Sequence, residues 1–386
     1  MIEPKLRFKA DDGSQFPDWE EKTIDEVAEF LDYKRVPVNS EERKKRVGII
    51  PYYGAGGIQG YIDDYLFDEE LVLLLEDGDA FDDFQTKSIA QYITGKSWVN
   101  NHAHVLRANG NSYFLFASLE HKDIRRWTQL AGASRKKLLK DSMLKITVNI
   151  PSLPEQQKIA DFLSTIDTVI EKQKETASAW EERKKGVMQK LFSQKVRFKA
   201  DDGDQFPEWE EKKLGEVFEF YNGKAHENVI SENGKYVVVN SKFISTDGTV
   251  RKYTNEMIFP LIKKDIVMVM SDVPNGKAIS KCFLINENNK YTLNQRICCL
   301  RTKENAVFYI NQISRNKYFL KFDDGVKQTN LRKNDILQCP LLCPCLAEQQ
   351  KIADCLSSLD EVIKKQKATL AVWEELKKGL LQQMFV

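Results

Sequence analysis

The sequence lacks most of the features that mark membrane, secreted or metal-binding proteins. Its longest apolar runs, such as 71–75 and 266–270, are far shorter than the roughly 20 residues that a helix needs to cross a bilayer. The first residues contain no apolar signal core, only four histidines are present, and the seven cysteines, all in the second half, show no zinc-ribbon spacing. These absences predict a soluble protein of a reduced cytoplasmic compartment.

Two kinds of residue could still suggest a metal or redox centre. Cys298 and Cys299 are adjacent, and Cys343 and Cys345 flank one proline, but free cysteines are often small buried apolar residues, which is the interpretation we favour. His102 and His104 would point the same way on a strand, which suits metal ligation, although no third ligand lies in that stretch. We therefore predict no metal site.

The size and charge of the chain suggest more than one domain and one basic surface. Its 386 residues exceed a single ordinary core, so we expect two or three domains. The net charge of +1 does not by itself suggest a nucleic-acid partner. Its distribution is uneven, because residues 221–343 carry 19 Lys and Arg against 11 Asp and Glu, whereas residues 31–150 carry 17 against 16. Such a local excess is expected on a surface that faces phosphates.

An internal repeat determines the organisation of the chain. Residues 7–30 return at 197–220 with 18 of 24 positions identical, and residues 155–192 return at 348–385 with 24 of 38 identical. The segments between them, about 31–136 and 221–329, do not resemble each other. Two copies of one scaffold therefore carry two unlike inserts, as a protein with two different reading surfaces requires.

The longer repeat predicts a helix with a coiled-coil stripe. Steps of four and three residues meet mostly hydrophobic side chains for over four heptads, and the remaining positions carry balanced charge. The seam residues are Ile159, Leu163, Ile166, Ile170, Gln173, Trp180, Ile352, Leu356, Leu359, Ile363, Gln366 and Trp373. We expect the tryptophans to be packed in the seam rather than to form a stacking platform.

Neither helix can bury its stripe alone, so we expect the two to pack antiparallel about a pseudo-twofold axis. Gln173 and Gln366 fall near the middle of the stripes and could meet there to set the register, or could simply be tolerated at half-exposed positions. A helix of 38 residues is roughly 57 Å long, comparable to one to two turns of B-DNA, so the pair could act as a ruler.

The sequence resembles the specificity subunit, called S, of type I restriction-modification systems. The resemblance lies in Trp-Glu-Glu-Lys at 19–22 and 209–212, in Glu-Gln-Gln-Lys-Ile-Ala-Asp at 155–161 and 348–354, and in Pro151 and Pro344 ahead of the latter. It extends to the insert segments 52–60, 98–104, 271–277 and 325–331. It covers essentially the whole chain.

The resemblance implies an α+β fold with two mixed α/β target recognition domains and two long antiparallel helices. The expected boundaries are 1–150 for the first recognition domain, 151–194 for the first helix, 195–343 for the second recognition domain and 344–386 for the second helix. Each domain would read one half of a bipartite double-stranded DNA target. The resemblance also implies two modification subunits that use S-adenosylmethionine, and restriction subunits that use ATP and Mg. This chain would bind no cofactor and have no catalytic centre.

Sequence reading requires forked donors and acceptors that reach base edges, together with cations for phosphates. The candidates in the first head are Arg43, Lys44, Lys45, Arg46, Gln59, Asn100, Asn101, Arg135, Lys136 and Lys137. Those in the second head are Asn275, Lys277, Asn294, Gln295, Arg296, Lys327, Gln328, Asn330 and Arg332. For any one of them a turn-capping or solvated role is an open alternative, because Asn also favours turns.

Two other functions remain as alternatives. For an autonomous enzyme, Gly95-Lys96-Ser97 resembles the end of a phosphate loop but lacks the earlier glycine, and the acidic pairs 82–83 and 323–324 could suggest a metal nuclease. The other alternative is a coiled-coil scaffold that never touches DNA. The unlike inserts and the basic second segment argue against it.

The heads should be compact mixed α/β units. Residues 236–239 and 266–269 predict buried strands, 308–322 predicts a helix, and the glycine-rich stretch 54–60 is typical of a hairpin.

Overall fold

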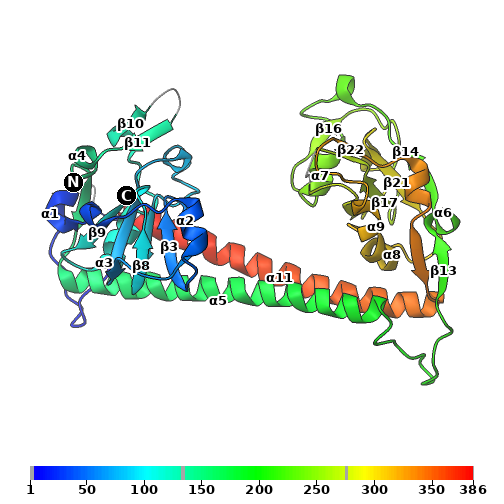
Figure 1. Ribbon diagram of the computed structural model, residues 1–386, viewed down its shortest axis with the longest axis horizontal. Coiled ribbons are helices and arrows are strands. Elements are labelled where there is room, and N and C mark those ends of the chain that lie inside the picture. Colours follow the sequence, from blue (N-terminus) through cyan, green and yellow to red (C-terminus); the bar gives the residue numbers. More distant parts are fainter. Residues whose placement is uncertain (1–3, 132–134, 274–276, 386) are drawn as a thin grey trace. The chain divides into compact units, whose positions relative to one another are not determined.

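A computed structural model describes residues 4–131, 135–273 and 277–385, apart from the side chains of Asp79, Ala131 and Arg135. The chain divides into two compact units (Figure 1). Unit 1 comprises Met1–Glu175 and Lys367–Val386, and unit 2 comprises Thr176–Gln366. The long helices therefore do not form a unit of their own, because each unit holds one head with part of both helices.

Both long repeats form uninterrupted helices, as the sequence predicts. Helix α5 spans Leu153–Phe192 and helix α11 spans Leu346–Phe385, each with 40 residues (Figure 1, green and orange to red). Pro154 lies in the first turn of α5, where its missing N–H would have no partner in the helix.

The head of unit 1 is built on two four-stranded sheets. The first has the antiparallel order β2-β9-β6-β7, and the second has the order β4-β3-β8-β5, in which β3 and β8 are parallel. The strands of these sheets are β2 (Ala28–Phe30), β9 (Ala103–Ala108), β6 (Leu71–Leu75), β7 (Ala90–Ile93), β4 (Gly57–Ile62), β3 (Ile50–Gly54), β8 (Lys96–Val99) and β5 (Phe67–Asp68). The strand pair β1 (Glu20–Thr23) with β12 (Thr147–Ile150), the hairpin β10 (Thr128–Ala131) with β11 (Arg135–Leu138), and helices α1 (Ile24–Val27), α2 (Ser40–Lys45), α3 (Ser112–Leu119) and α4 (Lys140–Met143) complete it.

The head of unit 2 follows the same plan although its insert is unlike the first in sequence. Its antiparallel sheet has the order β14-β21-β17-β19, and its second sheet has the order β16-β15-β20, with β15 and β20 parallel. These strands are β14 (Glu219–Asn222), β21 (Ile297–Arg301), β17 (Ile266–Val269), β19 (Cys282–Leu284), β16 (Lys252–Thr254), β15 (Tyr236–Val239) and β20 (Tyr291–Leu293). The pairs β13 (Glu210–Lys213) with β23 (Pro340–Cys343) and β18 (Ser271–Asp272) with β22 (Thr329–Asn330), and helices α6 (Leu214–Val217), α7 (Ser241–Ser245), α8 (Ala306–Ile313), α9 (Lys317–Leu320) and α10 (Lys333–Leu337), complete it.

The expectations for the heads are confirmed with one correction. Residues 236–239 and 266–269 are strands β15 and β17, and residues 54–60 lie in the β3–β4 hairpin, where Gly54 pairs with Gly57. The single helix expected over 308–322 is wrong, because α8 ends at Ile313 and α9 begins at Lys317. Arg315 has a φ of 56°, a left-handed conformation that breaks a helix, and the Asn316 side chain caps the next one.

The seam side chains are buried mainly where the helices meet the heads. Ile159, Leu163, Ile166 and Ile170 join the core of unit 1 together with head residues and with Leu381 and Met384 from the end of α11. In unit 2, Ile352 and Leu356 join the corresponding core with Leu191 from the end of α5, and Ile363 is also buried. Gln173, Trp180, Leu359, Gln366 and Trp373 are only partly buried. The idea that the helices bury their stripes only on each other is therefore incomplete.

The repeated Glu-Gln-Gln-Lys sequence holds each head on its helix. Glu155, with a fully buried side chain, receives two hydrogen bonds from the Arg7 guanidinium, and Gln156 accepts one from the Asn111 backbone N–H. The Asn111 side chain donates to Gln157. In unit 2 the same three contacts are Arg197 to Glu348, the Asn305 N–H to Gln349 and the Asn305 side chain to Gln350.

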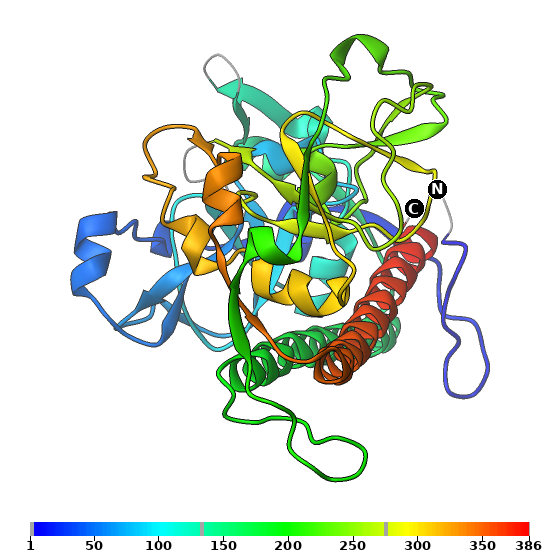
Figure 2. The same cartoon turned by 90° about the vertical axis from the view of Figure 1, so that its right-hand side faces the viewer.

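The beginning of the described chain lies beside the last turn of α11 in unit 1 (Figure 2). The Leu6 N–H donates to the Gln383 carbonyl at 3.1 Å. In unit 2 the corresponding bond, at 3.3 Å, joins the Val196 N–H to the Lys190 carbonyl within one continuous stretch of chain.

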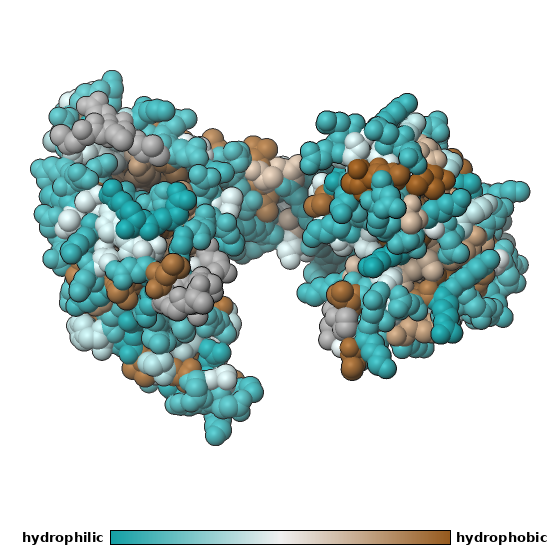
Figure 3. All heavy atoms as spheres, turned by 90° about the horizontal axis from the view of Figure 1, so that it is seen from above, coloured by the Kyte–Doolittle hydropathy of each residue, from teal (hydrophilic) through white to brown (hydrophobic). Residues whose placement is uncertain are grey.

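Hydrophilic residues cover most of each unit on the face seen in Figure 3, with small hydrophobic patches between them. None of the helices in the described part of the chain combines the length and apolarity needed to span a membrane.

Candidate nucleic-acid interface

The candidate residues of the second head come from three segments that meet at one edge of unit 2. Strands β18 and β22 pair Ser271 with Asn330, and the Gln328 side chain donates to the Ser271 hydroxyl at 2.6 Å. The Met270 N–H, at the end of β17, donates to the carbonyl of Arg296 at 3.0 Å. Residues that are 26 or more positions apart in sequence are thus brought together.

Most of the candidates at this edge are exposed. Those with exposed side chains are Lys277, Gln295, Arg296, Lys327, Gln328, Asn330 and Arg332, whereas Asn294 is half-buried. The Gln295 side chain donates to Glu227 at 2.9 Å, and Arg332 occupies the N-cap position of α10. Asn275 lies outside the described residues.

The acidic residues of these loops organise the backbone rather than face one another. Asp272 accepts hydrogen bonds from the N–H groups of Ala278 and Ile279 at 2.7 and 3.0 Å. The N–H groups of Lys327 and Val326 bind Asp324 and hold the pKa of its carboxyl below the usual value. The pair 323–324, considered as nuclease ligands from the sequence, therefore has a local structural role in shaping the loop.

Apart from the basic run 43–46, the candidates of the first head lie on β4, in the turn after β8 and on β11. Asn100 is 4% exposed, and its side-chain amide donates to Gln59 at 3.3 Å. Asn101, next to it, is exposed. Lys136 forms an ion pair with Asp82. The side chain of Arg135 lies outside the described part of the structure, and Lys137 belongs to a network considered below.

The basic run 43–46 forms the end of helix α2 and its C-cap. The Arg43 guanidinium lies 4.7 Å from the centre of the Tyr52 ring. Arg46 pairs with Asp63 at 2.8 Å and lies over Trp98. Lys44 pairs with Glu41 at 2.7 Å, and Lys45 is exposed. The two arginines are therefore held in place, while the lysines remain at the surface.

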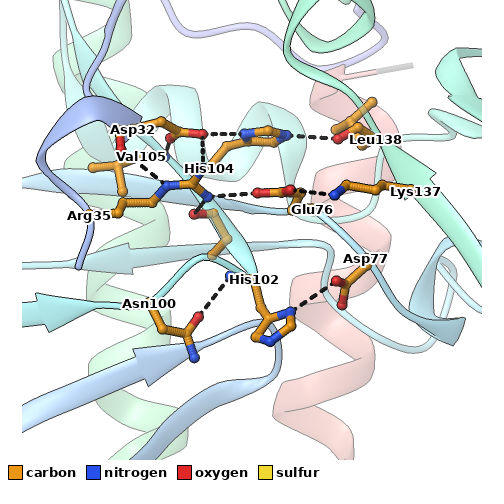
Figure 4. A network of polar contacts seen from close by, with 11 residues as sticks. Asp32, Arg35, Glu76, Asp77, Asn100, His102, His104, Val105, Lys137 and Leu138 are labelled. Carbon is orange, nitrogen blue, oxygen red and sulfur yellow. Dashed lines mark hydrogen bonds and ion pairs between the residues drawn. The ribbon is translucent and has the colours of Figure 1, made fainter. Parts of the chain in front are cut away.

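A partly buried network of polar contacts fixes the base of the β10–β11 hairpin (Figure 4). The Glu76 carboxylate forms ion pairs with Arg35 at 2.7 Å and with Lys137 at 2.9 Å. Burial alone would raise the pKa of Glu76, but the hydrogen bonds from Arg35 and Lys137 bring it below the usual value. Asp32 contacts both Arg35 and His104 at 2.7 Å. The hairpin is thus bound to the sheet through its strand β11.

Asp32, Glu76 and His104 are close enough to one another to be examined as a metal site. His104 lies on β9, and both its ring nitrogens already face acceptors, the Asp32 carboxylate at 2.7 Å and the Leu138 carbonyl at 2.9 Å. The carboxylates are occupied by Arg35 and Lys137. These contacts fit an ion network better than a metal centre.

His102 does not share the strand of His104, contrary to the geometry considered from the sequence, because it lies in the turn before β9. Its Nδ1 contacts Asp77 at 2.9 Å, and its backbone N–H donates to the Asn100 side chain at 2.8 Å (Figure 4). Sequence reasoning considered this residue only as a metal ligand and missed its place beside the candidate reading residues.

Two further sequence features have structural explanations. Gly95 forms the turn between strands β7 and β8 with a φ of 69°, whereas a phosphate loop joins a strand to a helix. Cys282, Cys298, Cys299, Cys339 and Cys343 are buried, and burial raises the pKa of Cys298 to about 12. That thiol is therefore neutral at ordinary pH, as expected for a packing residue.

Comparison with known proteins places these features in a family. Residues 17–177 and 207–372 match the family model of the type I restriction modification DNA specificity domain. A putative type I restriction enzyme specificity subunit of Haemophilus influenzae is 39% identical over 147 residues, which are 38% of this chain and only 36% of that protein. The MjaVIII specificity subunit of Methanocaldococcus jannaschii is 25% identical over 413 residues, covering 97% of this chain and 94% of that protein.

The fold is similar to that of a solved specificity subunit. The crystal structure of the type I restriction-modification system S subunit from M. genitalium matches with a TM-score of 0.64 at 16% sequence identity, and the match covers 100% of this chain and 99% of that one.

Proposed function

Because this chain belongs to the family of type I restriction-modification DNA specificity domains, we propose that each of its heads reads one half of a bipartite DNA target. Its role is DNA sequence specificity within a restriction-modification complex. The chain supplies the reading surfaces and no catalytic group of its own.

The observation that carries this proposal is that two heads of the same architecture present different candidate residues. Both heads have the same strand order in their antiparallel sheet and the same Arg–Glu and Gln–Asn contacts to their helices. The candidate base-reading residues, in contrast, differ between the heads in type and number. A protein that must read two different sequences in a fixed geometry needs this combination.

The helices provide the frame through an antiparallel, pseudo-twofold arrangement. Within unit 1, Lys377 of α11 pairs with Asp167 of α5 at 2.8 Å. Within unit 2, Lys184 of α5 pairs with Asp360 of α11 at 2.7 Å. The 193-residue offset of the repeat separates Asp167 from Asp360 and Lys184 from Lys377. The aspartate lies on α5 in one pair and on α11 in the other, which supports a twofold relation. That Gln173 and Gln366 meet near the axis stays a prediction.

The exposed charged faces of the helices are the surfaces on which two modification subunits would dock. Those subunits would supply S-adenosylmethionine-dependent adenine methylation, and restriction subunits would bring ATP- and Mg-dependent translocation and cleavage. This chain would bind no cofactor itself.

The test uses the full chain assembled with its modification subunits. A random double-stranded DNA library should yield a consensus in two specified parts with an unread gap. Replacing residues 31–136 by the insert of another specificity subunit should change only one part. A complex that selects no bipartite sequence would support the scaffold alternative instead, and methylation or cleavage by the isolated chain would contradict a role limited to reading.

A further inference from the structure

Both heads contain the same asparagine-capped turn at the edge where the candidate residues gather. In unit 1 it joins β8 to β9, and the Asn100 N–H donates to the Tyr53 carbonyl at 3.0 Å. In unit 2 it joins β20 to β21, and the Asn294 N–H donates to the Val239 carbonyl at 3.1 Å. Tyr53 lies on β3, which runs parallel to β8, and Val239 lies on β15, which runs parallel to β20.

The third residue of each turn is held by two matching backbone contacts. The Asn100 side chain accepts from the His102 N–H at 2.8 Å, as the Asn294 side chain accepts from the Arg296 N–H at 3.4 Å. The carbonyls of His102 and Arg296 then accept from the Glu76 and Met270 N–H groups at 3.1 and 3.0 Å.

This series of backbone hydrogen bonds ends in each head at a residue of the sequence repeat. The carbonyls of Glu76 and Met270 accept from the N–H groups of Leu138 and Leu331, both at 2.8 Å. Leu138 and Leu331 are separated by the 193-residue offset of the repeat. His102 and Arg296 therefore occupy the same place in the two heads, although Asn-Asn-His and Asn-Gln-Arg share only the asparagine.

The side chains at this place can reach a partner outside the chain. Arg296 is exposed, and its guanidinium has no hydrogen bond to any described residue. The His102 side chain is 42% exposed. Its Nδ1 faces the Asp77 carboxylate, whereas Nε2 has no hydrogen bond within the described residues (Figure 4). Because a carboxylate only accepts, the Asp77 contact selects the tautomer with a proton on Nδ1, and in that tautomer of the imidazole Nε2 is an acceptor.

We propose that His102 and Arg296 are equivalent base-reading residues, one in each half of the target, and that Asn100 and Asn294 position them without contacting DNA. This inference rests on the proposed function and names residues for it. An arginine donates two hydrogen bonds to guanine O6 and N7. The acceptor Nε2 of His102 suits the exocyclic amino group of adenine or cytosine instead. The two turns thus read different bases from the same position.

Reciprocal substitutions in the complete complex with modification subunits test this assignment. With H102R we expect one base pair of the first half-site to change toward G·C while the second half-site keeps its sequence. R296H should change one base pair of the second half-site only. H102A should lower discrimination at the same first-half base pair by roughly ten- to hundredfold without favouring a new base. The unchanged half-site reports in each case that the complex is assembled and folded.

His121→Arg provides the matched control, since His121 is another partly exposed histidine of unit 1 and is not among the candidate reading residues. It should leave the base pair assigned to His102 unchanged. The assignment is overturned if H102R, H102A and R296H all select the wild-type sequence. A wild-type complex that selects no bipartite sequence would overturn the proposed function and this inference together, so the two failures are distinguishable.

Discussion

The guanidinium of Arg7 donates two hydrogen bonds, at 3.1 and 2.8 Å, to a Glu155 carboxylate that is fully buried. Arg197 makes the same two contacts with Glu348. Each pair joins the short repeat that precedes a head to the first turns of the helix that follows it. Each Arg–Glu pair thereby connects the two ends of the segment that forms a head.

Removing Arg7 should destabilise unit 1 strongly, because it leaves a buried carboxylate without its cation. We expect R7A to cost about 3–5 kcal/mol. R197A should cost less, since Glu348 also accepts a hydrogen bond from Trp209 Nε1 at 2.9 Å. Hydrogen exchange of the peptides that contain the two glutamates measures both variants in one experiment. Equal protection in R7A and wild type would contradict a stabilising role for this pair.

The base of the β10–β11 hairpin should loosen in acid. Arg35 and Lys137 keep the pKa of Glu76 below its usual 4.5 despite burial, so the stabilisation is present above that value. It is lost as the pH falls through the folded-state pKa. Hydrogen exchange at residues 135–138 should accelerate between about pH 5 and pH 3 in wild type. In E76Q it should be fast already at neutral pH, and an unchanged rate in that variant would exclude the network as the anchor.

Lys377 and Lys184 occupy equivalent positions of the repeat, but we expect their ion pairs to contribute differently to stability. Lys377 contacts Glu120 and Asp167 and is 12% exposed, whereas Lys184 contacts Asp360, which is 55% exposed. K377M should therefore lower the stability of unit 1 more than K184M lowers that of unit 2, with K184M costing under about 1 kcal/mol. Urea unfolding followed separately in each unit measures the difference.

Lys377 also carries a pH dependence at alkaline pH. Burial alone would lower its pKa, but Glu120 and Asp167 raise it above the usual 10.5. Its contribution is complete below pH 10.5 and is lost as the pH rises through the higher folded-state value. K377M should abolish this alkaline loss in unit 1, while K184M should leave it intact.

Chelation should leave the folded chain unchanged. The carboxylates near His104 bind Arg35 and Lys137, and both ring nitrogens of His104 face acceptors. We expect the melting temperature of the isolated chain to be the same with EDTA and with added Zn²⁺. A rise with Zn²⁺ that H104A removes would show that a metal competes for this network.

The helices could be predicted from the sequence because their signal is local. A stripe with heptad spacing and no interior proline specifies a helix whatever surrounds it. The expected range 308–322 failed for an equally local reason, since the left-handed Arg315 and the cap at Asn316 divide an otherwise helical pattern. Turn geometry at a residue other than glycine leaves little trace in composition.

The contacts that hold the heads could not be predicted. Arg7 and Glu155 lie in segments that the repeat singled out, but they are 148 positions apart, and no pattern in one sequence pairs them. The equivalence of His102 and Arg296 was hidden for a related reason, because it rests on backbone hydrogen bonds that leave the side chains free to differ. Residue type selected the candidates but did not separate the capping Asn100 from its neighbours.

The bond between Leu6 and Gln383 repeats, across the two ends of the chain, what the bond between Val196 and Lys190 makes along continuous backbone. Covalent continuity at this junction is therefore not a requirement of the fold. A circular permutant that joins residue 386 to residue 1 and opens between 193 and 196 should build both units with their contacts intact. The two halves of the reading device could then be encoded in either order.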